Sequence, residues 1–143
     1  MAIIAVLAVV VFVALNPAQR LEDTRDAKRV SDTQTILTAI HASIVDNAGA
    51  LPSGLTAGMS QTQIGTAATG CGGTVGVCSI TPTGCVDLTT PLANYLNTIP
   101  IDPTGGTTYT AAETGYSVVV SAAGLVTVTA CGTEGATTIS ASR

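Results

Sequence analysis

Residues 2–15 read AIIAVLAVVVFVAL, without a polar side chain, and after Asn16 and Pro17 the chain continues into the charged segment AQRLEDTRDAKRVSDTQTILTAIHASIVDNAG at residues 18–49. Ten of these fourteen residues are large and apolar. Burial of each contributes roughly 1.5 to 3 kcal/mol, so full exposure would forgo on the order of 15 to 30 kcal/mol, more than the ~5 to 15 kcal/mol by which a whole domain is stable. We therefore expect this segment to lie in lipid, in the protein's own core or against copies of itself.

Residues 18–48 have the pattern of an amphipathic helix. Apolar residues recur at spacings of three, four and seven, and Gly49 is a natural helix terminator. They are Val30, Leu37, Ile40, Ile44, Val45 and Ala48. Pro17 removes a backbone hydrogen bond and clashes with the preceding turn. The sequence therefore predicts one long helix with a weak point at Pro17, between an apolar half at residues 1–17 and an amphipathic half at residues 18–48.

Residues 49–143 have the composition of a small β-rich head. Thr, Ala, Ser and Gly dominate, and the length is sufficient for a compact domain. Two β-branched runs, Tyr116–Val120 and Leu125–Cys131, are separated by the turn residues 121–124 and predict a hairpin. Its apolar face, Tyr116, Val118 and Val120 with Val126, Val128 and Ala130, should pack on the helix residues Leu37, Ile40 and Ile44. The predicted fold class is α+β, a long helix on a small antiparallel sheet.

The middle of the head lacks a regular spacing of apolar residues. Residues 49–84 lack sustained periodicity and predict a long irregular loop with at most one short element, tied by Cys71 and Cys78. Pro91 suits the first position of a short helix over Pro91–Leu96. The Pro-rich residues 97–106 then predict a rigid turn segment.

The four cysteines, Cys71, Cys78, Cys85 and Cys131, predict two disulfides in an oxidising compartment. Zinc is the weaker alternative, because six residues separate each of the first three cysteines and structural zinc sites space their ligands more closely. Four cysteines allow three pairings. Of these we favour Cys71 with Cys78 and Cys85 with Cys131.

Basic residues are confined almost entirely to the start of the amphipathic helix, and the only later one is Arg143. The acidic head argues against a nucleic-acid-binding surface. Opposite charges three apart, such as Glu22 with Arg25 and Asp26 with Arg29, suit a solvated helix surface. The alternative is a zone that sets the register between subunits, formed by Arg20, Glu22, Arg25, Asp26 and Arg29.

The apolar segment has the length of a signal peptide, but no basic residue precedes it and Pro17 occupies the region of a cleavage site. Fourteen residues cover about 21 Å of helix, less than the ~30 Å hydrocarbon core of a bilayer. About six more apolar residues would let the segment span a membrane.

This arrangement resembles the type IV pilins and the related pseudopilins of type II secretion. The matching features are the apolar residues 2–15, the break at Pro17, the charged residues 20–29, the segment DNAGALP at 46–52 and IPIDPTG at 99–105 before Tyr109. The last segment is similar to the Pro-x-Asp-Pro-x-Gly motif of pseudopilins and short bacterial pilins. The family's basic leader, Gly cleavage site and Phe-initiated stretch with a Glu at its fifth position do not precede Ala2, which implies that roughly ten residues are missing before it.

The resemblance implies a structural subunit that is held in the inner membrane, drawn into a helical homopolymer by the pilus assembly machinery, and displayed as an extracellular filament. The core of such a filament would be formed by Ile3, Ile4, Val6, Leu7, Val10, Val11, Phe12 and Leu15. The alternative is an adhesin-like binding module, membrane-tethered or secreted, that does not polymerise.

Catalytic groups are scarce. The only histidine, His41, lies on the predicted helix, and Asp102 between two prolines is a turn-former rather than a general base. We therefore expect neither an enzyme nor a bound cofactor. Some pseudopilins carry calcium in their late loops, and Asp102, Glu113 and Glu134 are candidate ligands here, although their spacing matches no compact calcium loop.

Overall fold

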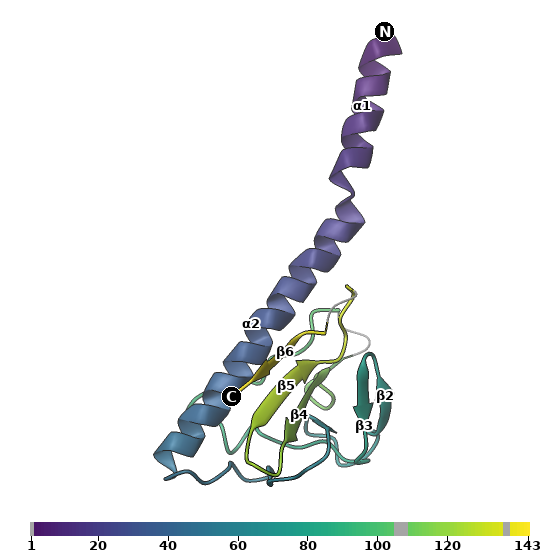
Figure 1. The fold of residues 1–143 in the computed structure, drawn as a ribbon. Coiled ribbons are helices and arrows are strands. Elements are labelled where there is room, and N and C mark those ends of the chain that lie inside the picture. The colour runs from purple at the N-terminus through teal and green to yellow at the C-terminus, as the bar shows by residue number, and fades with distance from the viewer. Residues whose placement is uncertain (1, 105–108, 136–137) are drawn as a thin grey trace.

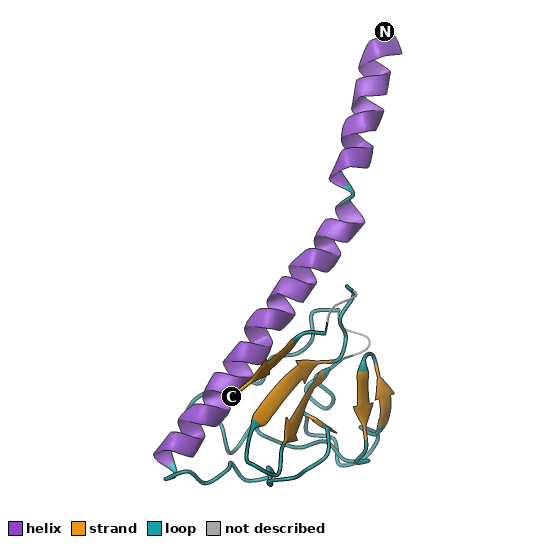
Figure 2. Cartoon of the chain, in the orientation of Figure 1, coloured by secondary structure: helices purple, strands orange, loops and turns teal. Residues whose placement is uncertain are grey.

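A computed structural model describes residues 2–104, 109–135 and 138–143 of the chain and consists of a helical rod attached to a compact head (Figure 1). Helix α1 spans Ala2–Leu15, and helix α2 spans Pro17–Asp46. The second half of α2 lies across the strands of the head, whereas α1 projects away from them (Figure 2). The head is therefore attached to one end of the rod only.

The described residues of the head form two antiparallel sheets. The larger has the strand order β1-β4-β5-β6, and the smaller pairs β2 with β3. The strands are β1 Thr62–Gln63, β2 Gly73–Val75, β3 Cys78–Ile80, β4 Tyr116–Val120, β5 Val126–Ala130 and β6 Ser140–Ser142. The predicted α+β class, a long helix with a small antiparallel sheet, is confirmed.

The predicted hairpin is strands β4 and β5, although β5 is one residue shorter at each end than predicted. Tyr116 pairs with Ala130 and Val120 with Val126, so the register matches the alternation of apolar residues. Gly124 has a φ of 86°, and its N–H donates to the carbonyl of Ser121 at 2.9 Å. A left-handed φ without steric cost is what glycine supplies to a tight connection.

The core lies between α2 and the larger sheet. Ile36 and Ile40 of α2 are fully buried, as are the inward-facing residues of β4 and β5, and Leu37 is 8% exposed. Ile44 packs at the edge of this core. Val30 and Val45, predicted to belong to the same stripe, are instead 42% and 76% exposed. Successive helical residues differ by about 100°, so Val45 points away from the face that carries Ile44.

Two predictions for the middle of the chain are wrong. Residues 49–84 hold β1 and the β2–β3 hairpin rather than at most one short element. The predicted helix at Pro91–Leu96 is absent, because residues 91–95 form turns, with individual hydrogen bonds such as Leu96 N–H to the Leu92 carbonyl at 2.8 Å. A few residues cannot recover the cost of helix nucleation, and burial of Leu88 and Leu92 in the core fixes this segment instead.

The disulfides are Cys71–Cys85 and Cys78–Cys131, so the predicted count is correct and the favoured pairing is wrong. Backbone hydrogen bonds decide the partners. The Val77 N–H donates to the carbonyl of Cys131 at 2.9 Å, which brings the β2–β3 hairpin to the end of β5. The Cys78–Cys131 bond therefore ties the smaller sheet to the larger one.

Loss of the Cys78–Cys131 bond should destabilise the head more than loss of Cys71–Cys85. The two bonds enclose 53 and 14 residues. In the chain-entropy description, the disulfide that closes the longer loop stabilises the fold by about 4 kcal/mol and the other by about 3 kcal/mol. Urea unfolding of detergent-solubilised full chain carrying Cys→Ala pairs should show this order. Peptide mapping without reduction should recover the two pairings, and a 71–78 linked peptide would contradict the structure.

Candidate functional site

The described apolar side chains of α1 are exposed. The large ones, Ile3, Ile4, Val6, Leu7, Val9 and Val10, are 58–77% exposed. This includes five of the predicted filament-core residues. The side chains of the other three, Val11, Phe12 and Leu15, lie outside the described part of the chain. Because α1 has no polar residue on any side, its entire circumference is apolar.

The joint between α1 and α2 is at Asn16, one residue before the predicted break. Asn16 has φ 26° and ψ 73°, outside the helical range, and Pro17 begins α2. Proline fits the first position of a helix because that residue needs no intrahelical N–H bond. Over the described residues, neither α1 nor α2 reaches the combination of length and apolar character that crossing a bilayer requires.

The charged residues at the start of α2 fall into two groups, those that are exposed and those that bind the head. Arg20 and Glu22 are exposed on the part of the rod outside the head. Arg25 instead forms a salt bridge with Glu134, at 2.7 Å between Nη2 and Oε2. Asp26 accepts the backbone N–H groups of Glu134, at 3.3 Å, and Gly135, at 2.9 Å. These contacts attach a loop of the head to the rod, and an intersubunit role for the stretch stays a prediction.

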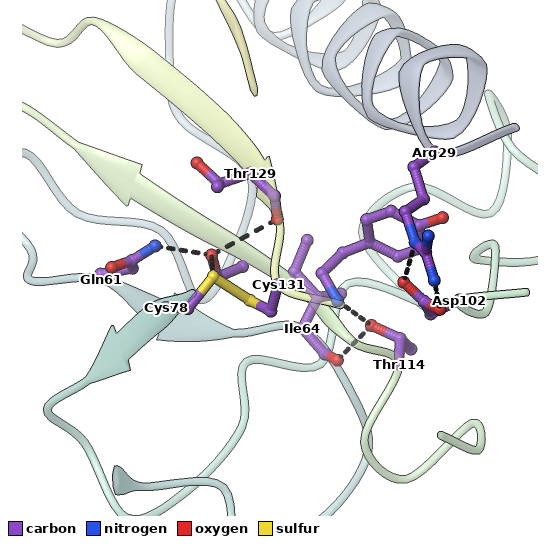
Figure 3. Close-up of a disulfide and its surroundings, with 10 residues drawn as sticks. Arg29, Gln61, Ile64, Cys78, Asp102, Thr114, Thr129 and Cys131 are labelled. Carbon is purple, nitrogen blue, oxygen red and sulfur yellow. Dashed lines mark hydrogen bonds and ion pairs between the residues drawn. A yellow bond between two sulfur atoms is a disulfide. The ribbon is translucent and has the colours of Figure 1, made fainter. Parts of the chain in front are cut away.

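Arg29 lies at the centre of this network and is fully buried. Its Nε and Nη2 donate to the two carboxylate oxygens of Asp102, each at 2.8 Å, as seen at the right of Figure 3. Nη1 donates to Asp26 at 2.6 Å, and Nη2 also contacts the Thr104 hydroxyl. The bidentate geometry satisfies a planar guanidinium and a carboxylate together, which a buried ion pair requires.

A second polar contact lies farther along the same helix. The hydroxyl of Tyr116, a fully buried β4 residue, donates to Asp32 Oδ2 at 2.8 Å. Lys28 forms a salt bridge with the same carboxylate at 2.8 Å. Burial first, and the bond to Asp32 second, raise the pKa of Tyr116, so its hydroxyl remains a donor.

The carboxylates of the Arg29 network are held ionised. Burial alone would raise the pKa of Asp102, but hydrogen bonds from Arg29 and Thr104 outweigh it and hold that pKa below its usual 3.8. Burial likewise opposes the ionisation of Asp26, and its backbone and Arg29 hydrogen bonds again lower the pKa. Arg29 itself has a raised pKa, because its bonds to Asp102 and Asp26 exceed the effect of burial.

Sequence reasoning missed the main role of Asp102. The predicted turn is present, since Asp102 Oδ1 accepts the Thr104 N–H at 2.9 Å. Gly105 and Gly106, at the end of the predicted turn segment, lie outside the described residues. The pairing with Arg29 could not be found from spacing because 73 residues separate the two. The available signal was the placement of Asp102 between two prolines, which restricts the backbone around it.

The Cys78–Cys131 disulfide lies on the side of the sheet opposite α2 (Figure 3). Cys78 Sγ is 3.3 Å from the hydroxyl of Ser117, which also accepts the side-chain N–H of Gln61 at 2.8 Å. Both half-cystines and Ser117 are buried. All four cysteines are paired and therefore do not present a zinc-binding thiolate set.

The three candidate calcium ligands do not form a common site. Asp102 is paired with Arg29, and Glu134 with Arg25. Glu113 does not complete a set with them, and within the described ranges no group of three or more His, Cys, Asp or Glu side chains could hold a metal ion. His41 Nε2 lies 3.1 Å from the carbonyl of Arg143, at the C-terminal end of the sheet.

Comparison of the chain with protein-family models, with curated proteins and with solved structures gave no match.

Replacement of Asp102 by Asn should destabilise the protein by about 3 to 5 kcal/mol, because it removes the charge of the carboxylate that binds both Nε and Nη2 of a fully buried guanidinium. The double variant Arg29→Met, Asp102→Leu should recover much of this loss, since both members of the fully buried ion pair are removed together. Asp23→Asn, on the exposed surface of the same helix, serves as the control. Chemical unfolding followed by circular dichroism measures all three, and equal stability of D102N and D23N would contradict the role assigned to the pair.

Acid should loosen the contact between head and rod. Asp102 and Asp26 have lowered pKa values in the folded state, so the unfolded state binds more protons. Their contribution is present above pH ~4 and is lost as the pH falls through the folded pKa values. Thermal melting from pH 6 to pH 2 should show a steeper loss of stability for the wild type than for D102N. Parallel curves would indicate that Asp102 is not the linked group.

Proposed function

We propose that the chain is a structural subunit of a type IV pilus-like or pseudopilus filament that polymerises through α1. The observation that carries the proposal is the solvent exposure of an all-apolar helix. The six described large side chains of α1 would contribute about 9 to 18 kcal/mol on burial, comparable with the stability of a whole domain. A helix that is apolar on every side requires several neighbours, which a bundle of identical helices provides.

The attachment of the head to the rod supports the same proposal. Arg25, Asp26 and Arg29 bind head loops where α2 first meets the head. The rod and head of one copy are thus joined by a buried charge network as well as by the apolar core. Copies added one after another through α1 would therefore carry their heads in a constant orientation, as a helical filament needs.

In this proposal the subunit has two successive environments. Membrane lipid surrounds α1 before assembly, with the pilus assembly machinery of the inner membrane as the partner. Neighbouring α1 helices replace the lipid afterwards, and the disulfide-tied heads form the outer surface. Disulfides fit a head that folds in an oxidising compartment.

A single charge placed in α1 should abolish assembly without unfolding the head, and two separate variants test this. The variants are Val6→Asp and Val10→Asp, each adding a carboxylate to a helix whose burial is required. The matched control is Val77→Asp, because Val77 is similarly exposed, at 57%, but lies in the β2–β3 turn. Cells expressing each full chain are sheared, and the released material is examined by electron microscopy and mass spectrometry.

We expect filaments containing this chain from the wild type and V77D, and none from V6D or V10D. Circular dichroism of detergent-extracted protein should show folded heads in every case. A wild-type chain that is recovered only as detergent-soluble monomer, with no filaments in the sheared fraction, would contradict the proposal and favour the non-polymerising adhesin-like module.

A further inference from the structure

The head has an apolar pocket of about 240 Å³ that the core does not fill. Its walls include Ile64, Leu88, Ile99 and Ile101, and Asp87 lies at its rim. Leu88 and Ile64 are fully buried, whereas Ile101 is 40% exposed and Asp87 is exposed. A cavity of roughly 150 Å³ holds a benzene ring, so this pocket has room for a branched aliphatic side chain.

A matching apolar side chain protrudes from the opposite end of the head. Leu125, in the β4–β5 turn, is 49% exposed. The pocket borders the start of β4, where the Ile64 N–H donates to the Tyr116 carbonyl at 2.8 Å, and Leu125 follows the end of β4. Five residues of strand separate these ends by about 17 Å. In Figure 1 the β4–β5 turn lies at the end of the head away from α1.

The two ends of the head also carry opposite charges. Arg143 is exposed and is joined to Val126 by two backbone hydrogen bonds, at 3.0 and 3.1 Å, so it lies at the end that carries Leu125. It is the only Lys or Arg in the chain after Arg29. Asp87 is held at the pocket rim because its Oδ1 accepts the Thr89 N–H at 2.8 Å. One end thus presents an apolar side chain with a cation, and the other a pocket with an anion.

We infer that these ends bind one another between copies of the chain, with Leu125 of one copy in the pocket of the next and Arg143 facing Asp87. Two different patches that complement each other form a head-to-tail interface, which repeats without closing when copies are related by a helical operation. The inference rests on the proposed filament and adds a specific contact between heads. The contact fixes the axial spacing of heads that α1 alone leaves free to slide.

A charge exchange tests the contact. Asp87→Arg and Arg143→Asp should each lower the yield of sheared filaments about tenfold, since each places like charges across the interface. The double variant should restore the yield to within about twofold of wild type, because the attraction is rebuilt in reverse. A triple variant, Asp87→Arg with Thr74→Asp and Thr81→Asp, has the same net charge as the double variant. It should remain defective, because both added acids are exposed away from the pocket.

The apolar part of the contact has its own test. Leu125→Ala should reduce the filament yield, whereas Val77→Ala, which truncates a comparably exposed side chain in the β2–β3 turn, should not. A photoreactive amino acid at position 125 should cross-link to a peptide within residues 87–101 of another copy in assembled filaments. Circular dichroism of each extracted chain verifies that the head is folded.

The outcomes separate the two proposals. Wild-type filaments together with unchanged yields for D87R, R143D and L125A, or cross-links from position 125 to other peptides only, overturn this contact and leave the filament function standing. Restoration of yield by the charge-matched triple variant also overturns it, because net charge would then explain the effect. A wild-type chain that forms no filaments overturns both proposals.

Discussion

The burial of Arg29 constrains the rest of the structure. A guanidinium at 0% exposure needs hydrogen-bond acceptors and counter-charges. Asp102 and Asp26 accept its hydrogen bonds, and Glu134 lies 3.9 Å away as a further ion-pair partner. Asp102 comes from the loop before β4, Glu134 from the loop after β5, and Asp26 from the previous turn of α2. Both loops are thereby held against the rod at the point where α2 first meets the head. The apolar core beyond this point then packs α2 on the sheet.

The two parts of the rod have different surroundings, because the described residues of the head pack against α2 and not against α1. The sequence changes character between them, at Asn16 and Pro17. From Arg25 onward one face of the helix is covered by the head, and the other face is mostly polar. Before Asn16 every side of the helix is apolar, and none of the head residues that the structure describes reaches it (Figure 1). The head is stabilised internally by its core, its charge network and two disulfides, whereas the described part of α1 has no such contacts. This contrast is the physical basis for proposing assembly through α1.

The prediction of the β4–β5 hairpin succeeded because its signal is local. Alternating β-branched residues on both sides of a short turn specify strand direction, register and buried face together. The same reasoning failed for residues 49–84, where β1 has only two residues and gains its stability by pairing with β4. It also failed for Val30 and Val45, because spacing identifies helical neighbours but does not say which of two adjacent faces the sheet will cover.

By itself, the sequence determined the two-part helix, the break beside Pro17 and the α+β class, since each follows from residues close together along the chain. It also determined the number of disulfides, which follows from the count of four cysteines. Only the tertiary structure decided the partners of Arg29, the pairing of the cysteines and the pocket beside Ile64. These depend on groups dozens of residues apart, whose meeting is set by the register of strands and the docking of loops. The charges of α2 illustrate the difference: their spacing suits a solvated surface, yet Arg29 is buried because Asp102 is brought to it.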